Sequence, residues 1–374
     1  MIWWLFFIII CYSIIVISFI IGFDKVLYFE FKNYTPKTTF SVIVPFRNEA
    51  EKLPFLLQSI DKLNYPKDLF EFIFIDDASS DSSVKLISET LNKQIQYRII
   101  RNKRSSNSPK KDAITTAISK TKNNWILTTD ADCILPKNWL NTFNGFIQKN
   151  QPKMVVAPVS YQTKNTFFEQ FQLLDFLSLQ GVTIGGFGID KPFLCNGANL
   201  AYQKELFLQL NGFEGNNNIA SGDDIFLFEK FIKNNSKNVQ FLKAKEAIVQ
   251  TFPVKTLKDL VHQRVRWAAK SANYQLGFGK LVGSIVFLTN FSLLIFSFLA
   301  IFQQAPYQQF LLFFTIKLLL DFILFYKTSS FFHQQKAMYQ WFFPSSLLYP
   351  FFSVFVVLKS IFFNYQWKGR RFKK

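Results

Sequence analysis

The sequence predicts an α/β domain with a mostly parallel sheet and flanking helices, preceded and followed in the chain by transmembrane helices. Between residues 24 and 280, short apolar runs alternate with segments of helical spacing, which is typical of a parallel sheet covered by helices. Residues 1–23 and three runs after residue 280 are apolar and carry few charges. Such runs are long enough to span a bilayer.

Residues 1–23 contain no charged side chain. At about 1.5 Å per residue, a helix of this length crosses a hydrocarbon core of roughly 30 Å. A cleaved signal peptide is the alternative, but the segment lacks a basic start, its apolar run is long, and no small-residue cleavage pattern precedes Asp24. We therefore expect residues 1–23 to be a retained transmembrane anchor.

Residues 24–255 are expected to form one domain of repeated strand, loop and helix units. Ligands bind beyond the carboxyl ends of the strands in such sheets, so the residues that follow each strand are the candidates for a site. In chain order the expected elements are strand 40–46, helix 53–60, strand 72–75, helix 84–91, strand 97–100, helix 111–119 and strand 125–129.

Residues 256–280 are expected to form an amphipathic helix at the membrane surface. Gln263, Arg266 and Trp267 share one face, because they are three and four residues apart. On that face Arg266 would neutralise a diphosphate and Trp267 would stack on a sugar; a plain membrane-surface helix is the alternative. The other face is apolar and consists of Leu257, Leu260, Val261, Val265 and Ala268.

Residues 281–374 are expected to hold membrane segments and a basic tail. The apolar runs are 281–302, 310–326 and 338–363, and Lys317 and Asp321 are spaced to pair within the second run. Pro344 and Pro350 leave open whether the last run crosses the membrane, re-enters it or forms a hairpin. The tail contains five basic residues that favour the cytoplasmic side and anionic headgroups, Lys368, Arg370, Arg371, Lys373 and Lys374. If all three runs cross the membrane after a cytoplasmic domain, however, the basic tail lies on the opposite side of the membrane.

The formal net charge is +18. Residues 281–374 contribute nine basic residues and one acidic residue, and the basic residues do not form a recognisable nucleic-acid-binding motif. No nucleic-acid partner is therefore expected, whereas membrane lipids are. The three isolated cysteines and two histidines predict neither a zinc site nor a disulfide framework, and they fit a reducing compartment.

Acidic residues follow the predicted strands. Asp130 and Asp132 lie two residues apart after the fourth strand, so both carboxylates can reach one divalent cation, Mg²⁺ or Mn²⁺, that bridges to a diphosphate. Asp76 follows the second strand, where it can accept hydrogen bonds from a nucleotide, or serve with its neighbours as a helix cap. Asp223 and Asp224 begin a predicted helix, whose dipole favours an ionised carboxylate that can act as a general base or merely cap the helix.

Taken together, these motifs resemble those of the family 2 glycosyltransferases with a GT-A fold, a Rossmann-like catalytic domain. The resemblance extends over about residues 40–270 and is greatest to membrane-embedded members related to polysaccharide synthases and ceramide glucosyltransferases. It rests on the segments Val44-Pro45-Phe46-Arg47-Asn48-Glu49, Ile75-Asp76-Asp77-Ala78-Ser79-Ser80-Asp81, Thr129-Asp130-Ala131-Asp132, Gly222-Asp223-Asp224 and Gln263-Arg264-Val265-Arg266-Trp267.

The resemblance implies a role for each segment. It implies that Asp76 binds the nucleobase, that Asp130 and Asp132 bind diphosphate and metal, and that Asp224, rather than Asp223, is the catalytic base. Lys110 and Lys111 resemble the family's donor-contacting lysine, and Lys111 is preferred. The remaining expected donor contacts are Pro45, Arg47, Glu49, Gln263, Arg266 and Trp267, and the expected acceptor contacts are Asn196, Gly197 and Trp267.

The resulting expectation is inverting transfer of a sugar from a nucleotide sugar, with UDP the preferred nucleotide, to a lipid or glycan acceptor at the membrane. The chain would be an integral protein of the cell membrane with a cytoplasmic catalytic domain. A processive polysaccharide synthase is one alternative, although the membrane part is short for a polymer channel. A catalytically inactive glycan-binding scaffold is a second alternative. Such a scaffold would be expected to lack at least one of the acidic site residues, whereas every expected carboxylate is present in this sequence.

Overall fold

A computed structural model describes residues 2–32, 34–215, 222–271, 273–363, 365–367 and 370–372. The chain divides into two compact units. Unit 1 comprises Met1–Val26, Thr163–Leu194 and Pro253–Lys374, and unit 2 comprises Leu27–Gln162 and Cys195–Phe252. The expected domain limits at residues 23, 255 and 280 stay predictions. The segment Thr163–Leu194, which was expected inside the soluble domain, groups with the apolar helices of unit 1.

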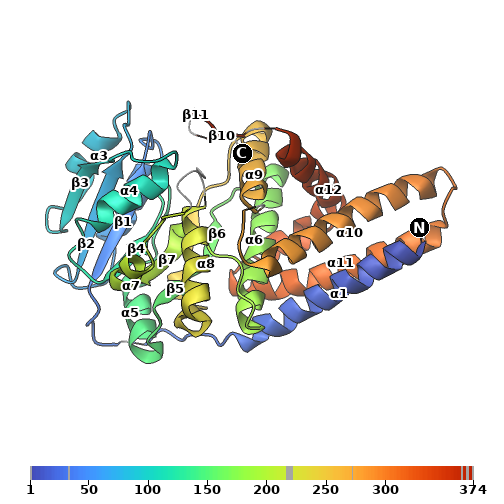
Figure 1. Ribbon diagram of the computed structural model, residues 1–374, viewed down its shortest axis with the longest axis horizontal. Coiled ribbons are helices and arrows are strands. Elements are labelled where there is room, and N and C mark those ends of the chain that lie inside the picture. Colours follow the sequence, from blue (N-terminus) through green and yellow to red (C-terminus); the bar gives the residue numbers. More distant parts are fainter. Residues whose placement is uncertain are drawn as a thin grey trace. The chain divides into compact units, whose positions relative to one another are not determined.

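Unit 2 is built on a seven-stranded sheet with the strand order β3-β2-β1-β4-β7-β5-β8 (Figure 1). The first four strands in this order are parallel to one another, and β7 runs antiparallel to both β4 and β5. The predicted mostly parallel sheet is confirmed. Its strands are β1 Phe40–Phe46, β2 Phe70–Asp76, β3 Tyr97–Arg101, β4 Trp125–Thr128, β5 Met154–Val156, β7 Leu200–Gln203 and β8 Val239–Phe241, and a separate parallel pair is formed by β6 Val159–Tyr161 and β9 Val249–Thr251.

Helices cover this sheet because its central strands are apolar on both faces. Val42 and Phe72, for example, are completely buried, as expected for parallel strands with helices on each side. The helix after β1 contacts the helix after β2, and α4 packs on β1 and β2. Figure 1 shows α4 in front of these strands. The α-helices of unit 2 are α2 Leu53–Asp61, α3 Ser83–Thr90, α4 Pro109–Ile118, α5 Trp139–Asn150, α7 Lys204–Gln209 and α8 Asp223–Asn235.

The strand order determines where a site can form. From β1 the chain adds β2 and β3 on one side and β4 on the other, and ligands of such sheets bind where the order reverses, beyond the carboxyl ends. Because β7 is antiparallel to β4, its first residue, Leu200, pairs with the last residue of β4, Thr128. The short 3-10 turn Gly197–Asn199 therefore lies at the same edge as the segment after β4.

The described part of unit 1 contains long helices and a pair of short antiparallel strands. Among the described residues, four helices, α1, α10, α11 and α12, are long and apolar enough to cross a membrane, by length and composition. The bounds are α1 Ile2–Lys25, α6 Phe167–Gly188, α9 Leu257–Ser271, α10 Gly277–Ile301, α11 Tyr307–Phe331 and α12 Gln335–Phe362, with the antiparallel strands β10 Tyr365–Trp367 and β11 Arg370–Phe372.

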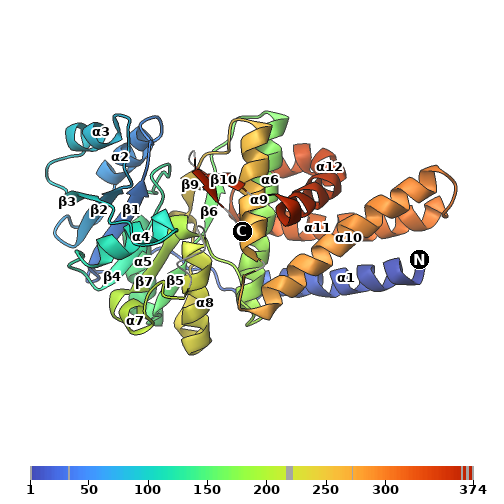
Figure 2. The same cartoon turned by 45° about the horizontal axis from the view of Figure 1, so that its top comes forward.

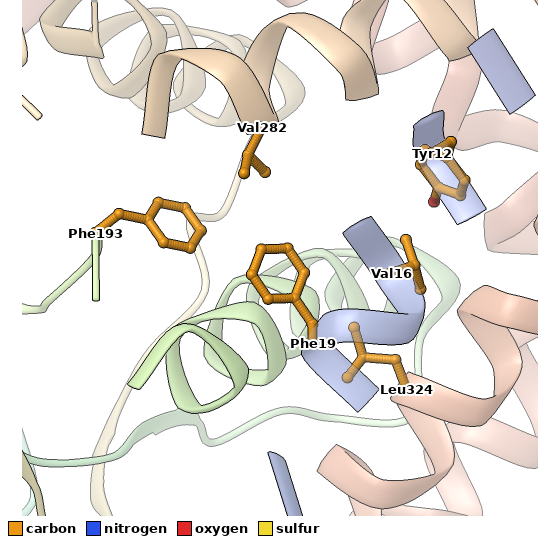
Figure 3. Close-up of a cluster of buried hydrophobic side chains, with 6 residues drawn as sticks. All are labelled: Tyr12, Val16, Phe19, Phe193, Val282 and Leu324. Atoms are coloured by element: carbon orange, nitrogen blue, oxygen red, sulfur yellow. The ribbon is translucent and has the colours of Figure 1, made fainter. Parts of the chain in front are cut away.

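Apolar packing joins these helices. One buried cluster draws Tyr12, Val16 and Phe19 from α1, together with Phe193, Val282 and Leu324 from elsewhere in the unit (Figure 3). Glycines bring α6 against α1, since a Cβ atom at Gly185 would lie 2.6 Å from the carbonyl oxygen of Phe19. The four potential spanning helices are thus part of one packed unit with α6.

Two expectations for the C-terminal segments have clear outcomes. Lys317 and Asp321 do pair, with 2.6 Å between Nζ and Oδ2. The last segment is one continuous helix through Pro344 and Pro350, so the hairpin alternative is wrong. In the basic tail, Lys368, Lys373 and Lys374 lie outside the described residues.

Candidate active site

The loops after β1 and β2 are held together by hydrogen bonds. The Arg47 guanidinium donates to the carbonyl oxygens of Asp77 at 2.6 Å and Ala78 at 3.0 Å. Ala78 adopts a φ of +59°, a left-handed conformation that costs an alanine energy and persists when its surroundings enforce it. Asp76 is buried and its Oδ1 accepts from the Ser79 amide at 2.8 Å. The predicted nucleobase loop is therefore shaped by Arg47, whose own contact with a donor stays a prediction.

The two carboxylates after β4 each face a lysine. Lys110 Nζ lies 2.7 Å from Asp130 Oδ1, and Lys52 Nζ lies 3.3 Å from Asp132 Oδ2. The Asp130 side chain is 38% exposed and that of Asp132 is 25% exposed, so both remain accessible to a ligand. Behind them, burial raises the pKa of the Cys133 thiol well above its ordinary value, and Asp132 and Asp130 raise it further, so Cys133 stays a neutral thiol.

The predicted acid pair lies at the start of α8 and reaches the same place. Asp223 Oδ2 is 3.4 Å from Lys110 Nζ, so one ammonium group bridges the segment after β4 and the acid pair. Asp224 accepts hydrogen bonds from the Gly197 amide at 3.2 Å and the Ile225 amide at 2.8 Å. These donors stabilise its ionised form.

Gly197 lies close to both acids. A Cβ atom at this position would be 3.3 Å from Asp223 Oδ2 and 3.3 Å from Asp224 Cβ, which is tighter than ordinary contact. The carbonyl oxygen of Gly197 accepts from the Thr128 hydroxyl at 2.7 Å. The backbone of the predicted acceptor loop is therefore fixed between β4 and α8, and a Cβ atom at Gly197 would fit only if the neighbouring acids shifted by a few tenths of an ångström.

Two neighbouring lysines, Lys110 and Lys111, lie in the first turn of α4. Lys110 points to the carboxylates; burial disfavours its charge, but Asp130 and Asp223 outweigh that effect and raise the pKa of the ammonium above its ordinary value. Lys111 is 1% exposed, and its ammonium lies 4.8 Å from the centre of the Phe226 ring. The donor contact predicted for Lys111 stays a prediction, and Lys110 lies beside Asp130 and Asp223.

Asp112 organises the segment that leads into α4. Its carboxylate accepts from the amides of Ser105 and Ser106 at 3.1 and 3.0 Å and from both of their hydroxyls. Burial works against the charge, but these hydrogen bonds prevail and lower the pKa of the Asp112 carboxyl. Arg104 in the same segment lies 3.6 Å from Asp77 Oδ1, which links α4 to the predicted nucleobase loop.

Three further predicted site residues take part in backbone pairing or hydrogen bonds within unit 2. Pro45 lies within β1 and pairs with Ile75 of β2. The Glu49 amide donates to Ser83 Oγ at 2.9 Å, which joins the first loop to α3. The Asn196 side chain accepts from the Ala198 amide at 2.9 Å and caps the short turn that contains Gly197. Direct contact of these three residues with donor or acceptor is untested.

The motif Gln263 to Trp267 lies on α9, which belongs to unit 1. Val261 and Val265 are buried against Val356 of α12, so the expected apolar face packs within the unit, although Leu257 is exposed. The Trp267 ring packs on Phe176 of α6. The carboxylates lie in unit 2, and the donor contacts predicted for Gln263, Arg266 and Trp267 stay predictions.

The sequence reasoning missed Lys52 and ranked Lys110 second. Both follow the carboxyl ends of strands closely in the chain: Lys52 immediately precedes α2 after β1, and Lys110 is the second residue of α4 after β3. Attention to basic as well as acidic residues at these places would have found them. Pairing with a particular carboxylate, however, depends on the tertiary arrangement.

The residues fit a divalent cation held by a small number of protein ligands. Asp130 and Asp132 offer carboxylate oxygens, the ligands preferred by Mg²⁺ and Mn²⁺. Among the described residues, no group of three or more His, Cys, Asp or Glu side chains is placed to hold a metal ion. This donor set suits a metal such as Mg²⁺ that binds through one or two carboxylates and completes its shell with phosphate and water.

Sequence comparison matches two family descriptions to this chain. The description "Glycosyl transferase family 2" matches residues 41–208. The description "Glycosyl transferase family group 2" matches residues 125–363. Together they include β1 to β9 and extend through the apolar helices α10 to α12.

Individual proteins that are similar to this chain are also named as glycosyltransferases or as synthases of glycosylated lipids. The chain is similar to the beta-monoglucosyldiacylglycerol synthase of Trichormus variabilis, with 24% identity over 249 residues that make up 65% of this chain and 51% of the relative. It is also similar to the poly(ribitol-phosphate) beta-N-acetylglucosaminyltransferase TarS of Staphylococcus aureus, with 27% identity over 31% of this chain and 20% of the relative. The matches thus span from a fifth to about half of the length of these relatives.

A solved structure shares the fold. A mannosyltransferase from Pyrobaculum calidifontis, in complex with GDP-Man and Mn²⁺, superposes with a TM-score of 0.54 at 15% identity over 96% of each chain. At this identity the likeness concerns the fold alone.

Proposed function

The chain belongs to the family 2 glycosyltransferases, and on this premise we propose that it transfers a sugar with inversion from a nucleotide-sugar donor to a lipid or glycan acceptor at a membrane. The GT-A fold class predicted from the sequence is confirmed. The observation that carries the proposal is the convergence of Asp130, Asp223 and Gly197 around the ammonium of Lys110. Three separate segments of the chain meet there at the carboxyl edge of the sheet.

The acceptor is activated by Asp224 in this proposal. Its carboxylate takes the proton of the acceptor hydroxyl as the acceptor oxygen forms a bond to the anomeric carbon, and the bond from that carbon to the diphosphate breaks. The nucleoside diphosphate leaves with the electron pair. Hydrogen bonds from the Gly197 and Ile225 amides orient the carboxylate. Asp223 suits the task less, because Lys110 lies beside it.

The donor is held at the other end of the site. Asp76 accepts from the nucleobase, and the loop that contains it is braced by Arg47. Asp130 and Asp132 would hold Mg²⁺ or Mn²⁺, which when bound neutralises charge that develops on the diphosphate. Lys110 adds a positive charge at the same place. UDP is the proposed nucleotide.

The proposed acceptor is a lipid or membrane-bound glycan, because the helices that could span a membrane belong to the same chain as the sheet. The family 2 relatives named above include a diacylglycerol-glucosylating synthase by its name, which is in keeping with a lipid acceptor. We also propose that unit 2 lies on the cytoplasmic side of the cell membrane, where nucleotide sugars are present.

Release of nucleoside diphosphate tests the function. The full chain is purified in nanodiscs with a membrane lipid extract, a panel of UDP-, GDP- and dTDP-sugars, and Mg²⁺ or Mn²⁺. We expect metal-dependent turnover of one donor, lost in Asp132→Ala and kept in Asp68→Ala, an exposed acid of the same unit. Direct calorimetric titration of each donor accompanies the assay. If no donor is bound and none is turned over, the proposal is overturned.

A further inference from the structure

Both acids of the predicted metal motif are already paired with lysines. Lys110 Nζ lies 2.7 Å from Asp130 Oδ1, and Lys52 Nζ lies 3.3 Å from Asp132 Oδ2. Lys110 also lies 3.4 Å from Asp223 Oδ2. A cation that binds Asp130 through Oδ1 must therefore compete with the Lys110 ammonium for that oxygen.

Lys110 is held more closely than Lys52. Its side chain is 17% exposed, whereas that of Lys52 is 27% exposed and lies at the longer distance of 3.3 Å from its carboxylate partner, Asp132. Lys110 comes from α4 and links the segment after β4 with the start of α8. Displacing its ammonium from Asp130 leaves a cation inside the site that needs a new anionic partner.

The charge of the site indicates what that partner is. The four carboxylates of Asp130, Asp132, Asp223 and Asp224 and the ammonium groups of Lys52 and Lys110 carry a net formal charge of −2, which one divalent cation neutralises. If the metal binds alone, it lies beside the ammonium of Lys110, and like charges at such short range repel. A diphosphate brings anionic oxygens that can bind the metal and the displaced ammonium together.

We propose that Lys110 is a built-in counter-ion that occupies the metal motif in the empty site and moves to the donor diphosphate, so that metal and nucleotide bind cooperatively and the metal alone binds weakly. This inference rests on the proposed function, because it assigns a nucleoside diphosphate and a divalent cation to this site. It concerns binding and requires no chemical step. Linkage makes the coupling reciprocal, so metal strengthens nucleotide binding by the factor by which nucleotide strengthens metal binding.

The test measures binding without turnover. Mn²⁺ is titrated into the full chain in nanodiscs and followed by electron paramagnetic resonance, with and without saturating UDP or GDP, and each nucleotide is titrated calorimetrically with and without Mn²⁺. In the wild type we expect nucleotide to tighten Mn²⁺ binding by a factor in the range of about 5 to 150, as is typical of coupled sites.

Variants of Lys110 distinguish two roles for this residue: a counter-ion that moves to the diphosphate, or a fixed link between α4 and its neighbours. In Lys110→Met we expect Mn²⁺ alone to bind several-fold tighter than in the wild type, nucleotide with Mn²⁺ to bind more weakly, and the coupling factor to fall toward one. Lys110→Arg keeps the charge and most of the coupling. Lys67→Met, which removes an exposed lysine of the same unit, leaves all three quantities unchanged.

The opposite outcomes are distinct. If Lys110→Met or Lys110→Gln binds Mn²⁺ alone no more tightly than the wild type, or keeps the wild-type coupling factor, Lys110 only ties α4 to its neighbours and the inference is overturned. If neither UDP nor GDP binds the wild type, and neither changes its affinity for Mn²⁺, the proposed function fails as well. Thermal unfolding of each variant identifies a loss of fold, in which case Lys110→Arg decides.

Discussion

Arg264 Nε donates to Asp175 Oδ2 at 2.5 Å, and both side chains are buried. The bond joins α9 to α6, two helices that run side by side in both views (Figures 1 and 2). The Arg264 guanidinium also lies 4.3 Å from the centre of the Trp267 ring. The helix that carries the Gln263 to Trp267 motif is thus positioned by a residue inside that motif.

Removing one partner of this pair is expected to destabilise the protein strongly. Arg264→Leu leaves the buried Asp175 carboxylate without its guanidinium, which typically costs about 3–5 kcal/mol. The double variant Asp175→Leu with Arg264→Leu should recover much of the loss, because no buried charge remains. Thermal unfolding in nanodiscs measures both, with Lys258→Leu on the exposed side of α9 as the control. Equal losses in the single and double variants would contradict this account.

The two acids at the start of α8 are expected to differ in function. Asp224→Asn should lower transfer by at least about 100-fold, in the range typical of a lost general base, while the dissociation constant of the donor stays within about twofold. Asp223→Asn should weaken donor binding, because Asp223 helps to hold the Lys110 ammonium in the site where the donor diphosphate would bind. Turnover and calorimetric titration separate the effects. Joint loss of binding and transfer in Asp224→Asn would refute its assignment as the base.

A methyl group at Gly197 should damage activity more than stability. The Cβ atom would lie 3.3 Å from both Asp223 Oδ2 and Asp224 Cβ, so the acids must shift by a fraction of an ångström. Small displacements of reacting groups can lower rates by about 100-fold. We expect Gly197→Ala to lower kcat at least tenfold with a small change in the unfolding temperature. Gly283→Ala is the control, because beyond the adjoining residues of its own helix no atom of the described chain lies within 4 Å of the added carbon.

Asp112 is expected to stabilise unit 2 in a pH-dependent manner. Its pKa is lower in the folded chain than in the unfolded chain, so its contribution is fully present above the unfolded pKa of about 3.9 and is lost as the pH falls through the folded pKa. Asp112→Asn should therefore cost about 1–3 kcal/mol at pH 7 and progressively less below pH 4. Chemical unfolding across this range measures the difference, with the exposed Asp68→Asn as the control. A cost that stays constant with pH would contradict the role of the charge.

Much of the fold was predictable because it rests on local patterns. Apolar runs such as Phe40–Phe46 and helical spacing such as that of Leu53 and Leu56 appear in the sequence itself. The positions of the acids after strands followed from the same alternation, since the carboxyl ends of parallel strands share an edge. The long, weakly charged C-terminal runs likewise predicted the helices later found at Gly277–Ile301 and Tyr307–Phe331.

Other features depended on contacts between segments far apart in the chain. The helix α6 was not predicted as a member of unit 1, because its packing on α1 depends on close approach at Gly22 and Gly185 rather than on a periodic apolar face. The continuous course of α12 through Pro344 and Pro350 also departs from what local sequence favours, since proline inside a helix removes a hydrogen bond. Both features depend on packing between helices that are far apart in the chain.

The sequence by itself determined the α/β class, the apolar helices and the identity of the acids near the site, because periodicity and residue chemistry are local properties. Only the tertiary structure decided which groups meet: Lys110 faces Asp130 and Asp223, and the Gly197 amide, at the edge where β7 runs antiparallel to β4, donates to Asp224. A charge pair or a close backbone approach is set by the geometry of several elements at once, and no single segment of sequence contains it.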